Sequence, residues 1–510
     1  MHRRPRLTLA LLFAALVPAA AALFYTAAAV SYRTDPRPAR NVAAELNAPW
    51  SGVPESQRAA TAYQRLNRAW QAADPPKPAD PYFGLRRLSP ADPTFPATAA
   101  LVRTLEPQLA DARAASRLPT LGADFRRSTP EERAESLNEP TDEVMLDSAI
   151  FLRIPGIGHA STATALLLID ADHAAITNDP ARFAADIHAT LAIARQVREI
   201  PILISDIVAL RAVEQAATRT RRALAEHPGL LDDRALAALQ TDLATTARNH
   251  TAIRPETERL GLTDILDRTF SPGPNGRITE VGIRQLDQIA TGTGGVRKII
   301  TKENAAVAPL LARTIGTRAE HLAWQDELIT RATAAREQGP AGVARYAGFE
   351  SDRMFDPYVE ERLVLAWMLH PALASALYEE HRVRLESEAT GVAIALERHR
   401  LTQGTYPTTL GQLIPDFLEA LPKDPFDLAG GPIKYRLTPT GPTLYFNGAN
   451  LHDDNASPPV FDPNDPYGTH AVSSFNPLAQ GQADPNAPAA DWVIFPDPAP
   501  IPTDQPDTPE

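Results

Sequence analysis

One cluster of titratable side chains has the spacing that a local catalytic or metal site needs. Asp170 and His173 lie three residues apart, with Asp172 between them, so Asp170 and His173 share one face of a predicted helix. A carboxylate beside an imidazole can hold a metal ion or move a proton. The alternative is a solvated, charged helix surface. We favour this second interpretation because no nucleophile and no further ligand accompanies the cluster.

A second cluster consists of Glu379, Glu380 and His381. Its neighbours Arg382 and Arg384 give the mixed charges of an ordinary charged helix face. The chain also lacks the patterns H-E-x-x-H and G-x-S-x-G, which mark zinc proteases and serine hydrolases. It has no Cys, which excludes disulfides, thiolate nucleophiles and Cys-ligated metals. The sequence therefore predicts that the protein is not an enzyme.

The distribution of charge argues against nucleic acid as a partner. The chain has 510 residues and a formal net charge of −12, and residues 437–510 contain ten acidic side chains without any Lys or Arg. The preceding part is nearly neutral, whereas nucleic-acid recognition needs a basic face. The length predicts two or three folding units.

The N-terminal segment predicts where the chain resides. Residues 1–6 contain three Arg, and residues 7–30 form an uncharged run of 24 residues. As a helix this run is about 36 Å long, enough to cross a hydrocarbon core of about 30 Å. The positive-inside rule places residues 1–6 in the cytoplasm. We predict a single-pass transmembrane helix or signal anchor in the bacterial inner membrane, in contact with the lipid bilayer, with the bulk of the chain periplasmic or extracellular. A cleaved signal peptide is the alternative.

The middle of the chain has the pattern of a helical protein. Residues 31–97 are predicted to be a Pro-rich tether with small helices, and residues 98–371 a helical domain. Short connections between its helices predict antiparallel packing in a helical-hairpin bundle. Asp179 is the expected N-cap of one helix. Pro201 is the expected start of the next, with Ile204 facing inward.

The chain changes character after the helical domain. Residues 372–403 contain one Gly and no Pro, which predicts a single long helix. Residues 433–437 and 443–446 are rich in β-formers and are separated by a hairpin-length loop. Residues 491–495 predict a third strand.

The order of motifs in this region points to a known family. The long helix is followed by G-x-Y-P, a short helix, L-P-x-D-P-F and the strand hairpin. In this order, residues 372–495 resemble the periplasmic part of the major pseudopilin of type II secretion systems. The resemblance implies a small α+β pseudopilin-like domain, a long helix plus a short antiparallel sheet, and residues 496–510 follow it as a disordered, acidic, Pro-rich tail. The residues that carry the resemblance are Gly404, Tyr406, Pro407, Leu410, Leu413, Pro415, Leu421, Pro422, Asp424, Pro425, Phe426, Tyr435, Tyr445, Gly448, Asn450, Asp453 and Asp454.

The resemblance also implies a metal. In the family the loop after the strand hairpin binds calcium, and the matching residues here are Asn450, Asp453, Asp454 and Asp491. Carboxylate and amide oxygens in an irregular loop are the ligands that calcium takes. The alternative is a solvated acidic loop, because the glycine pair expected after the aspartates is missing. We expect no other cofactor.

Together these features predict a mainly α protein, with an N-terminal transmembrane helix, an extracytoplasmic helical-hairpin bundle and a small C-terminal α+β domain. Its expected function is that of a membrane-anchored extracytoplasmic protein of structural or interaction type, associated with the cell envelope or a type II secretion-like system through unknown envelope proteins. One alternative is an exported enzyme whose unrecognised site uses carboxylates such as Asp170 or Glu380. The other is a peptide- or glycan-binding module.

Overall fold

The chain folds mainly into helices and carries one small antiparallel sheet in the part that the structure describes, as the sequence predicts. The structure is a computed structural model. It describes residues 20–36, 40–75, 88, 90–130, 132, 145–149, 151–292, 305–448, 450–457, 478 and 491–496.

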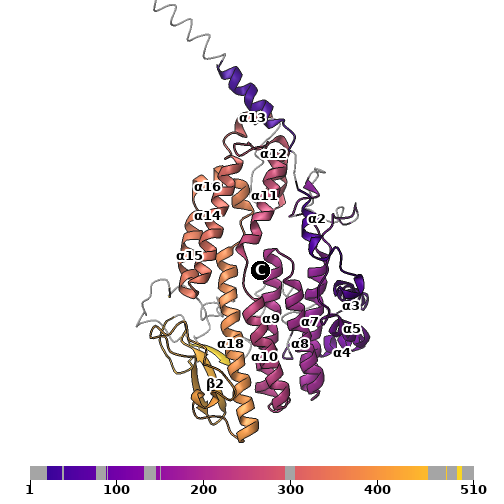
Figure 1. Ribbon diagram of the computed structural model, residues 1–510, viewed down its shortest axis with the longest axis vertical. Helices are drawn as coiled ribbons and strands as arrows, with labels where there is room; N and C mark the ends of the chain where they lie inside the picture. The colour runs from indigo at the N-terminus through magenta and orange to yellow at the C-terminus, as the bar shows by residue number, and fades with distance from the viewer. Residues whose placement is uncertain are drawn as a thin grey trace, which may run out of the picture.

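Five long helices form the centre of the molecule and lie side by side along its long axis (Figure 1). Asp179 is the N-cap of the second of them, and its carboxylate accepts a hydrogen bond from the backbone of Arg182, as predicted. Asp232 caps the fourth of them in the same way. The five are α7 (Pro155–Ile176), α8 (Pro180–Val197), α9 (Leu203–Glu226), α10 (Asp233–His250) and α18 (Leu373–Gln403).

The start and the inward face of α9 differ from the prediction. The helix begins at Leu203 rather than at Pro201, and Ile204 is 51% exposed instead of facing inward. Asp206 is fully buried on the same helix. Its carboxylate accepts a hydrogen bond from the backbone of Arg254, so the face of α9 that carries Asp206 is directed toward the interior.

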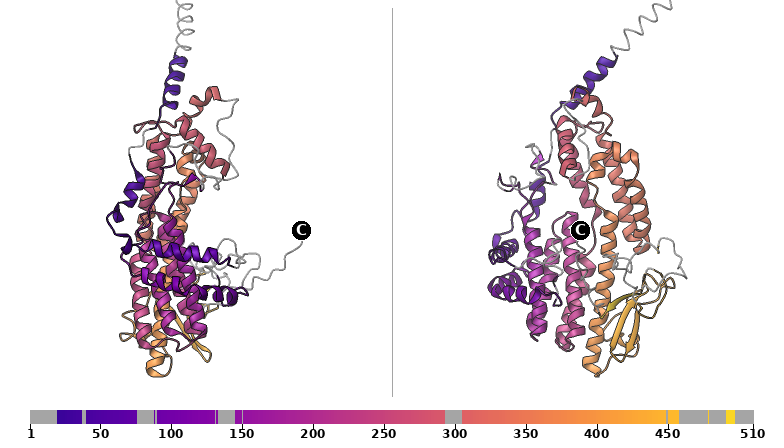
Figure 2. Two further views of the ribbon diagram at one scale, coloured as in Figure 1. Left: turned by 90° about the vertical axis from the view of Figure 1, so that its right-hand side faces the viewer. Right: turned by 180° about the vertical axis from the view of Figure 1, so that it is seen from behind.

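Smaller helices cover one side of this centre, and α3 packs against α5 and α7. They are α2 (Val42–Asn47), η1 (Ala48–Trp50), η2 (Glu55–Gln57), α3 (Ala60–Ala72), α4 (Phe95–Thr104) and α5 (Glu106–Ala115). Residues 20–32 form a helix that projects from the end of the molecule near α12 and α13 (Figures 1 and 2). Among the described residues, no helix combines the length and the apolar character needed to cross a membrane. Residues 7–19 of the predicted span lie outside the described residues.

A second group of helices extends along the first half of α18. Within it, α14 and α15 form an antiparallel pair that packs on α18, and α14 begins with a capping box made by Thr317 and Glu320. The group consists of η5 (Pro255–Thr257), α11 (Glu258–Thr269), α12 (Glu280–Gly292), η6 (Ala305–Val307), α13 (Ala308–Leu311), α14 (Arg318–Glu337), α15 (Pro340–Met354), α16 (Pro357–Arg362) and α17 (Val364–Met368). We call the helices α2 to α17 the helical body.

The C-terminal module consists of η7 (Leu410–Leu413) and the strands β1 (Lys434–Thr438), β2 (Gly441–Phe446) and β3 (Trp492–Phe495). The long helix α18 ends before it at Gly404, whose φ of +81° is the left-handed conformation that a side chain would strain. The strands lie in the order β1-β2-β3, and both pairs are antiparallel. The long helix and all three strands are therefore confirmed, with ends shifted by one or two residues.

One hydrophobic core joins the helical body to the C-terminal module. It contains Leu239 of α10 and Leu396 of α18 together with Phe426, Phe446 and Trp492 of the module. The long helix α18 contacts α9 and α10 on one side and β3 on the other (Figure 2). Because the same helix supplies both surfaces, body and module share their interior.

This shared core predicts that body and module unfold together. Phe426→Ala in the module and Leu239→Ala in the body should each shift the midpoint of one common unfolding transition to lower denaturant concentration. Each should reduce the free energy of unfolding by about 2–5 kcal/mol. Leu428→Ala is the matched control, because Leu428 is 56% exposed and its removal should cost less than about 0.5 kcal/mol. Two transitions, with each variant moving only one of them, would contradict a shared core.

Candidate functional site

The charged cluster on α18 lies inside the protein, so the predicted solvated face is wrong at Glu380 and His381. Their exposed fractions are 5% and 8%. One carboxylate oxygen of Glu380 accepts a hydrogen bond from the backbone of Ile253 at 2.7 Å, and both oxygens lie 2.9 Å from Nε of Arg336. Burial raises the pKa of Glu380 and lowers the pKa of His381 to about 4.

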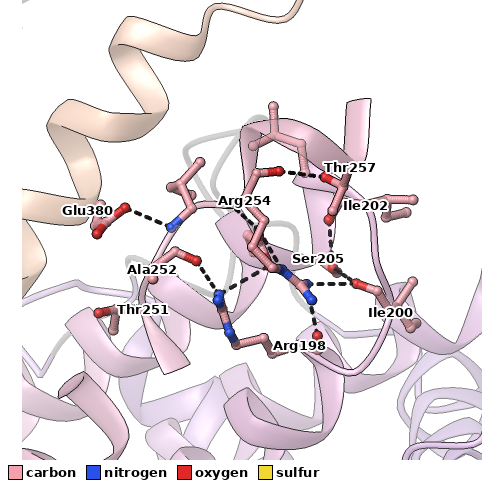
Figure 3. Close-up of polar contacts among 12 residues, drawn as sticks. Arg198, Ile200, Ile202, Ser205, Thr251, Ala252, Arg254, Thr257 and Glu380 are labelled. Carbon is pink, nitrogen blue, oxygen red and sulfur yellow. Dashed lines mark hydrogen bonds and ion pairs between the residues drawn. The ribbon is translucent and has the colours of Figure 1, made fainter. Parts of the chain in front are cut away.

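Glu380 belongs to a buried polar network that holds the connection between α10 and η5 (Figure 3). The guanidinium of Arg254 donates to Asp206 at 2.5 Å and to the backbone carbonyls of Arg198 and Ile200 at 2.9 and 3.0 Å. The side chain of Arg198 also donates to Asp206, at 3.2 Å. The hydrogen bonds named here all end on carbonyls or carboxylates of the chain itself, so the network joins three segments of the protein.

The two aspartates of the first predicted cluster are also buried, so the predicted solvated surface is wrong at Asp170 and Asp172, whereas His173 is only partly buried. Asp170 is fully buried and Asp172 is 4% exposed. Arg113 and Arg182 each lie 2.5 Å from the carboxylate of Asp170, and Arg219 lies 3.0 Å from Asp172. Burial raises the pKa of Asp170 to about 6. The structure does not bring His173 into these ion pairs, which join α5, α7, α8 and α9.

A signal in the sequence of α7 could have predicted this burial. Residues 163–169 are apolar or small except for Thr164, and no polar face separates them from Asp170. A helix that is apolar all round lies inside the protein, so any carboxylate on it needs a partner there. Contacts of α7 with α3, α4, α5, α8 and α9 surround it in this way.

The four predicted calcium ligands lie near one another around the loop after β2, but their oxygens are engaged within the chain. The Asp491 carboxylate is fully buried and accepts hydrogen bonds from the backbones of Asp454, Ala456 and Ser457. Asn450 donates its Nδ2 to Asp454 at 2.7 Å. Asp453 accepts from the Tyr445 hydroxyl at 2.9 Å.

These bonds do not fit a preformed metal centre. Among the described residues, no group of three or more His, Asp or Glu side chains has the arrangement of a metal site. An amide nitrogen directed at Asp454 cannot act as a ligand, and the Asp491 oxygens already fix the turn of residues 454–457. The calcium site therefore stays a prediction, and the described geometry assigns these side chains to holding the loop.

A groove of about 660 Å³ runs along the seam between the helical body and the C-terminal module. Residues 237–248 of α10 and 384–398 of α18 form two of its walls, and residues 417–422 form the third. Gln240 fixes its base, because its Nε2 donates to the carbonyls of Gly391 at 3.0 Å and Phe417 at 3.1 Å. The groove exists because α10 and α18 lie side by side and residues 417–422 border both helices.

The groove combines apolar side chains with side chains of both charges, and Glu388 and Glu419 are its acidic ones. Phe417 and Leu421 supply apolar surface, and the guanidinium carbon of Arg398 lies 5.3 Å from the centre of the Phe417 ring. Arg398 is paired with Asp233 at 2.8 Å. Arg248 lines the groove and is exposed. Such a surface suits an extended peptide with apolar side chains and a nearby carboxylate better than it suits a bond-breaking reaction.

An imidazole and a carboxylate also meet at a smaller hollow of about 330 Å³ between α5 and α8. Nδ1 of His188 lies 2.7 Å from Asp242, whose other oxygen lies 2.7 Å from Arg195. This arrangement orients the imidazole, as in many acid–base sites. The hollow is also lined by Ser116, whose hydroxyl donates to the backbone carbonyl of Arg113 at 2.8 Å. Its hydroxyl proton is thus used inside the chain rather than shared with the imidazole.

Comparison of the chain with protein-family models, with curated proteins and with solved structures finds no match in any of the three. The resemblance to the major pseudopilin therefore stays a prediction from the motif order.

The burial of Asp491 predicts a pH dependence of stability. Burial raises the pKa of Asp491 to about 6, so its carboxyl stabilises the folded state fully below about pH 4 and loses this contribution as the pH rises through 6. Asp491→Asn should reduce the fall in unfolding free energy between pH 4 and 7, by up to about 3 kcal/mol. Asp427→Asn is the control with the opposite sign, because a hydrogen bond from Lys434 lowers the pKa of Asp427. An unchanged pH profile in Asp491→Asn would contradict this account.

The hydrogen bonds of the loop also predict the response to calcium. Asp453, Asp454 and Asp491 already accept hydrogen bonds from the chain. We therefore expect the thermal unfolding midpoint of the full chain to be the same in millimolar calcium chloride as in a chelator. Magnesium chloride at equal ionic strength is the control for charge screening. A rise in the midpoint with calcium alone, abolished by Asp453→Asn, would instead establish the site that the pseudopilin resemblance implies.

Proposed function

We propose that the protein is a membrane-anchored extracytoplasmic protein of structural or interaction type, associated with the cell envelope or a type II secretion-like system. In this proposal residues 7–30 anchor the chain in the bacterial inner membrane, residues 1–6 are cytoplasmic, and the helical body carries a pseudopilin-like module outside. The apolar run and the three Arg before it support the anchor. The helix at residues 20–32 supports it as well, since it points away from the body (Figure 1).

The observation that carries the interaction role is the groove between α10, α18 and residues 417–422. Its volume of about 660 Å³ suits several residues of an extended segment, and its side chains combine apolar contacts with exposed Arg248. Neither the body nor the module forms this groove alone. A partner held there contacts both parts, which suits a protein that positions envelope components.

The module also differs from a subunit that polymerises through its long helix. The surface of α18 is occupied by α9, α10, α14 and α15 of the same chain. These helices cover much of α18, and the part that lines the groove is bordered by α10 and residues 417–422, so equivalent helices of neighbouring copies cannot pack along its whole length. We therefore propose a pseudopilin-like module that has been incorporated into a larger protein and presents its edge and loops to other partners.

Cysteine labelling tests export and groove occupancy in one experiment, because the native chain contains no Cys. In spheroplasts of the cells that make the protein, a membrane-impermeant maleimide should label Leu428→Cys, whereas Arg3→Cys should react only after lysis. Thr241→Cys, in the groove, should be protected in spheroplasts and react freely in purified protein, because a partner segment covers it.

The two parts of the proposal fail separately. Labelling of Arg3→Cys in spheroplasts without labelling of Leu428→Cys would contradict export. Equal reaction of Thr241→Cys and Leu428→Cys, both in spheroplasts and after purification, would contradict a partner in the groove while leaving export in place.

A further inference from the structure

The exposed aromatic side chains gather at one end of the molecule. Among the described residues, the exposed Phe and Tyr side chains are Phe24, Tyr25, Phe355 and Tyr358. Phe24 and Tyr25 lie on the helix of residues 20–32, which leaves the body beside α12 and α13. Phe355 and Tyr358 lie at the turn between α15 and α16, at the same end (Figure 1). The C-terminal module and the groove lie toward the opposite end.

The projecting helix is fixed to the body at this end. The Tyr25 hydroxyl donates to the carbonyl of Ala306 at 2.8 Å, and the hydroxyls of Ser31 and Ser271 lie 3.3 Å apart. Tyr32 is 9% exposed and packs in the core formed by α11 to α17. Because these contacts are spread over two turns of the helix, they set both its direction and its depth relative to the body.

The length of the apolar run then places this end near the membrane surface. In the proposed anchor, a helix of residues 7–30 exceeds a hydrocarbon core of about 30 Å by about 6 Å, so the outer boundary falls within about one turn of Tyr25. Its partner Ala306 lies at the same level, next to Val307, which is 45% exposed. The guanidinium carbon of Arg313 lies 5.1 Å from the Phe24 ring, where it can reach lipid phosphates.

The turn between α15 and α16 exposes two aromatic rings beside Arg362 and beside the acidic side chains of Asp352, Glu360 and Glu361. Phe355 is 82% exposed and Tyr358 is 56% exposed. The guanidinium carbon of Arg362 lies 5.6 Å from the Tyr358 ring centre. Tyr is enriched where membrane proteins meet the headgroup region of a bilayer, because its ring is apolar and its hydroxyl is polar. In water an uncovered Phe355 is unfavourable, and a lipid surface beside the anchor removes it from water.

From this geometry we propose that the aromatic end, made of Val307, Arg313, Phe355 and Tyr358, rests on the exported surface of the phospholipid bilayer. The anchor and the aromatic end then make two separate contacts with lipid, so the body has a fixed orientation on the membrane and the groove faces away from it. This inference rests on the anchor of the proposed function and specifies how the folded body contacts the same partner.

Depth-dependent quenching in vesicles tests this proposal with the full chain. Single-Cys variants carry a polarity-sensitive fluorophore and are reconstituted in phosphatidylcholine–phosphatidylglycerol vesicles, with or without lipids brominated on the acyl chains. The label on Phe355→Cys should shift to the blue and lose at least about half of its emission in brominated vesicles. Leu428→Cys, which is also exposed but lies in the C-terminal module, should keep a water-like, unquenched emission. Leu23→Cys reports the anchor, because Leu23 is 72% exposed on the projecting helix.

The three labels separate the possible failures. Quenching at position 23 without quenching at position 355 would overturn the second contact and leave the anchor intact. A blue shift at position 355 without bromine quenching would also overturn it, since protein rather than lipid then covers the end. No quenching at position 23 would overturn the anchor and the inference together. Because Phe355 and Leu23 are exposed, their replacement leaves the fold intact.

Discussion

The structure depends on the burial of carboxylates along α18. A buried carboxylate without a partner costs several kcal/mol, so each one on this helix dictates where another part of the chain must lie. Glu380 accepts a hydrogen bond from the backbone N–H of Ile253. Glu397, which is 2% exposed, accepts one from the backbone N–H of Gly229 at 2.9 Å. These two hydrogen bonds fix the chain segments that precede and follow α10. The long helix therefore determines the arrangement of the bundle as well as the position of the C-terminal module.

The sequence predicts the elements better than it predicts their surroundings. Asp179 and Gly404 end or begin helices for local reasons, and such positions can be read from residue types alone. Whether Asp170 and Glu380 face water depends on arginines from distant segments, such as Arg336. Local charge patterns do not contain this information. The lack of a continuous polar face on α7 and α18 is the sequence signal that comes closest to it.

The groove could not be predicted from the sequence either, because it also depends on contacts between distant segments. The long helix and the turn around Phe417 are both expected from the motif order, yet the groove needs α10 beside α18. Gln240 makes this contact over long stretches of chain, because it donates to the carbonyls of Gly391, 151 residues away, and of Phe417, 177 residues away. A long-range pairing of this kind follows from shared burial, as in the core residues Leu239 and Leu396, rather than from any pattern within one segment. The predicted calcium loop shows the opposite case. The sequence correctly indicates residues that lie near one another, but their side chains form hydrogen bonds within the loop.

Because α18 shares one core with the helical body and the C-terminal module, we infer that all three form one rigid unit, which keeps the groove at a set distance from the aromatic end. Pulsed electron–electron double resonance between spin labels at Phe355→Cys and Leu428→Cys measures the distance between the two ends directly in the full chain, which has no native Cys. The account predicts a single narrow distance distribution that is the same in detergent and in vesicles. A broad distribution, or two distances whose proportions change with the environment, would show that the module moves on the body and would contradict it.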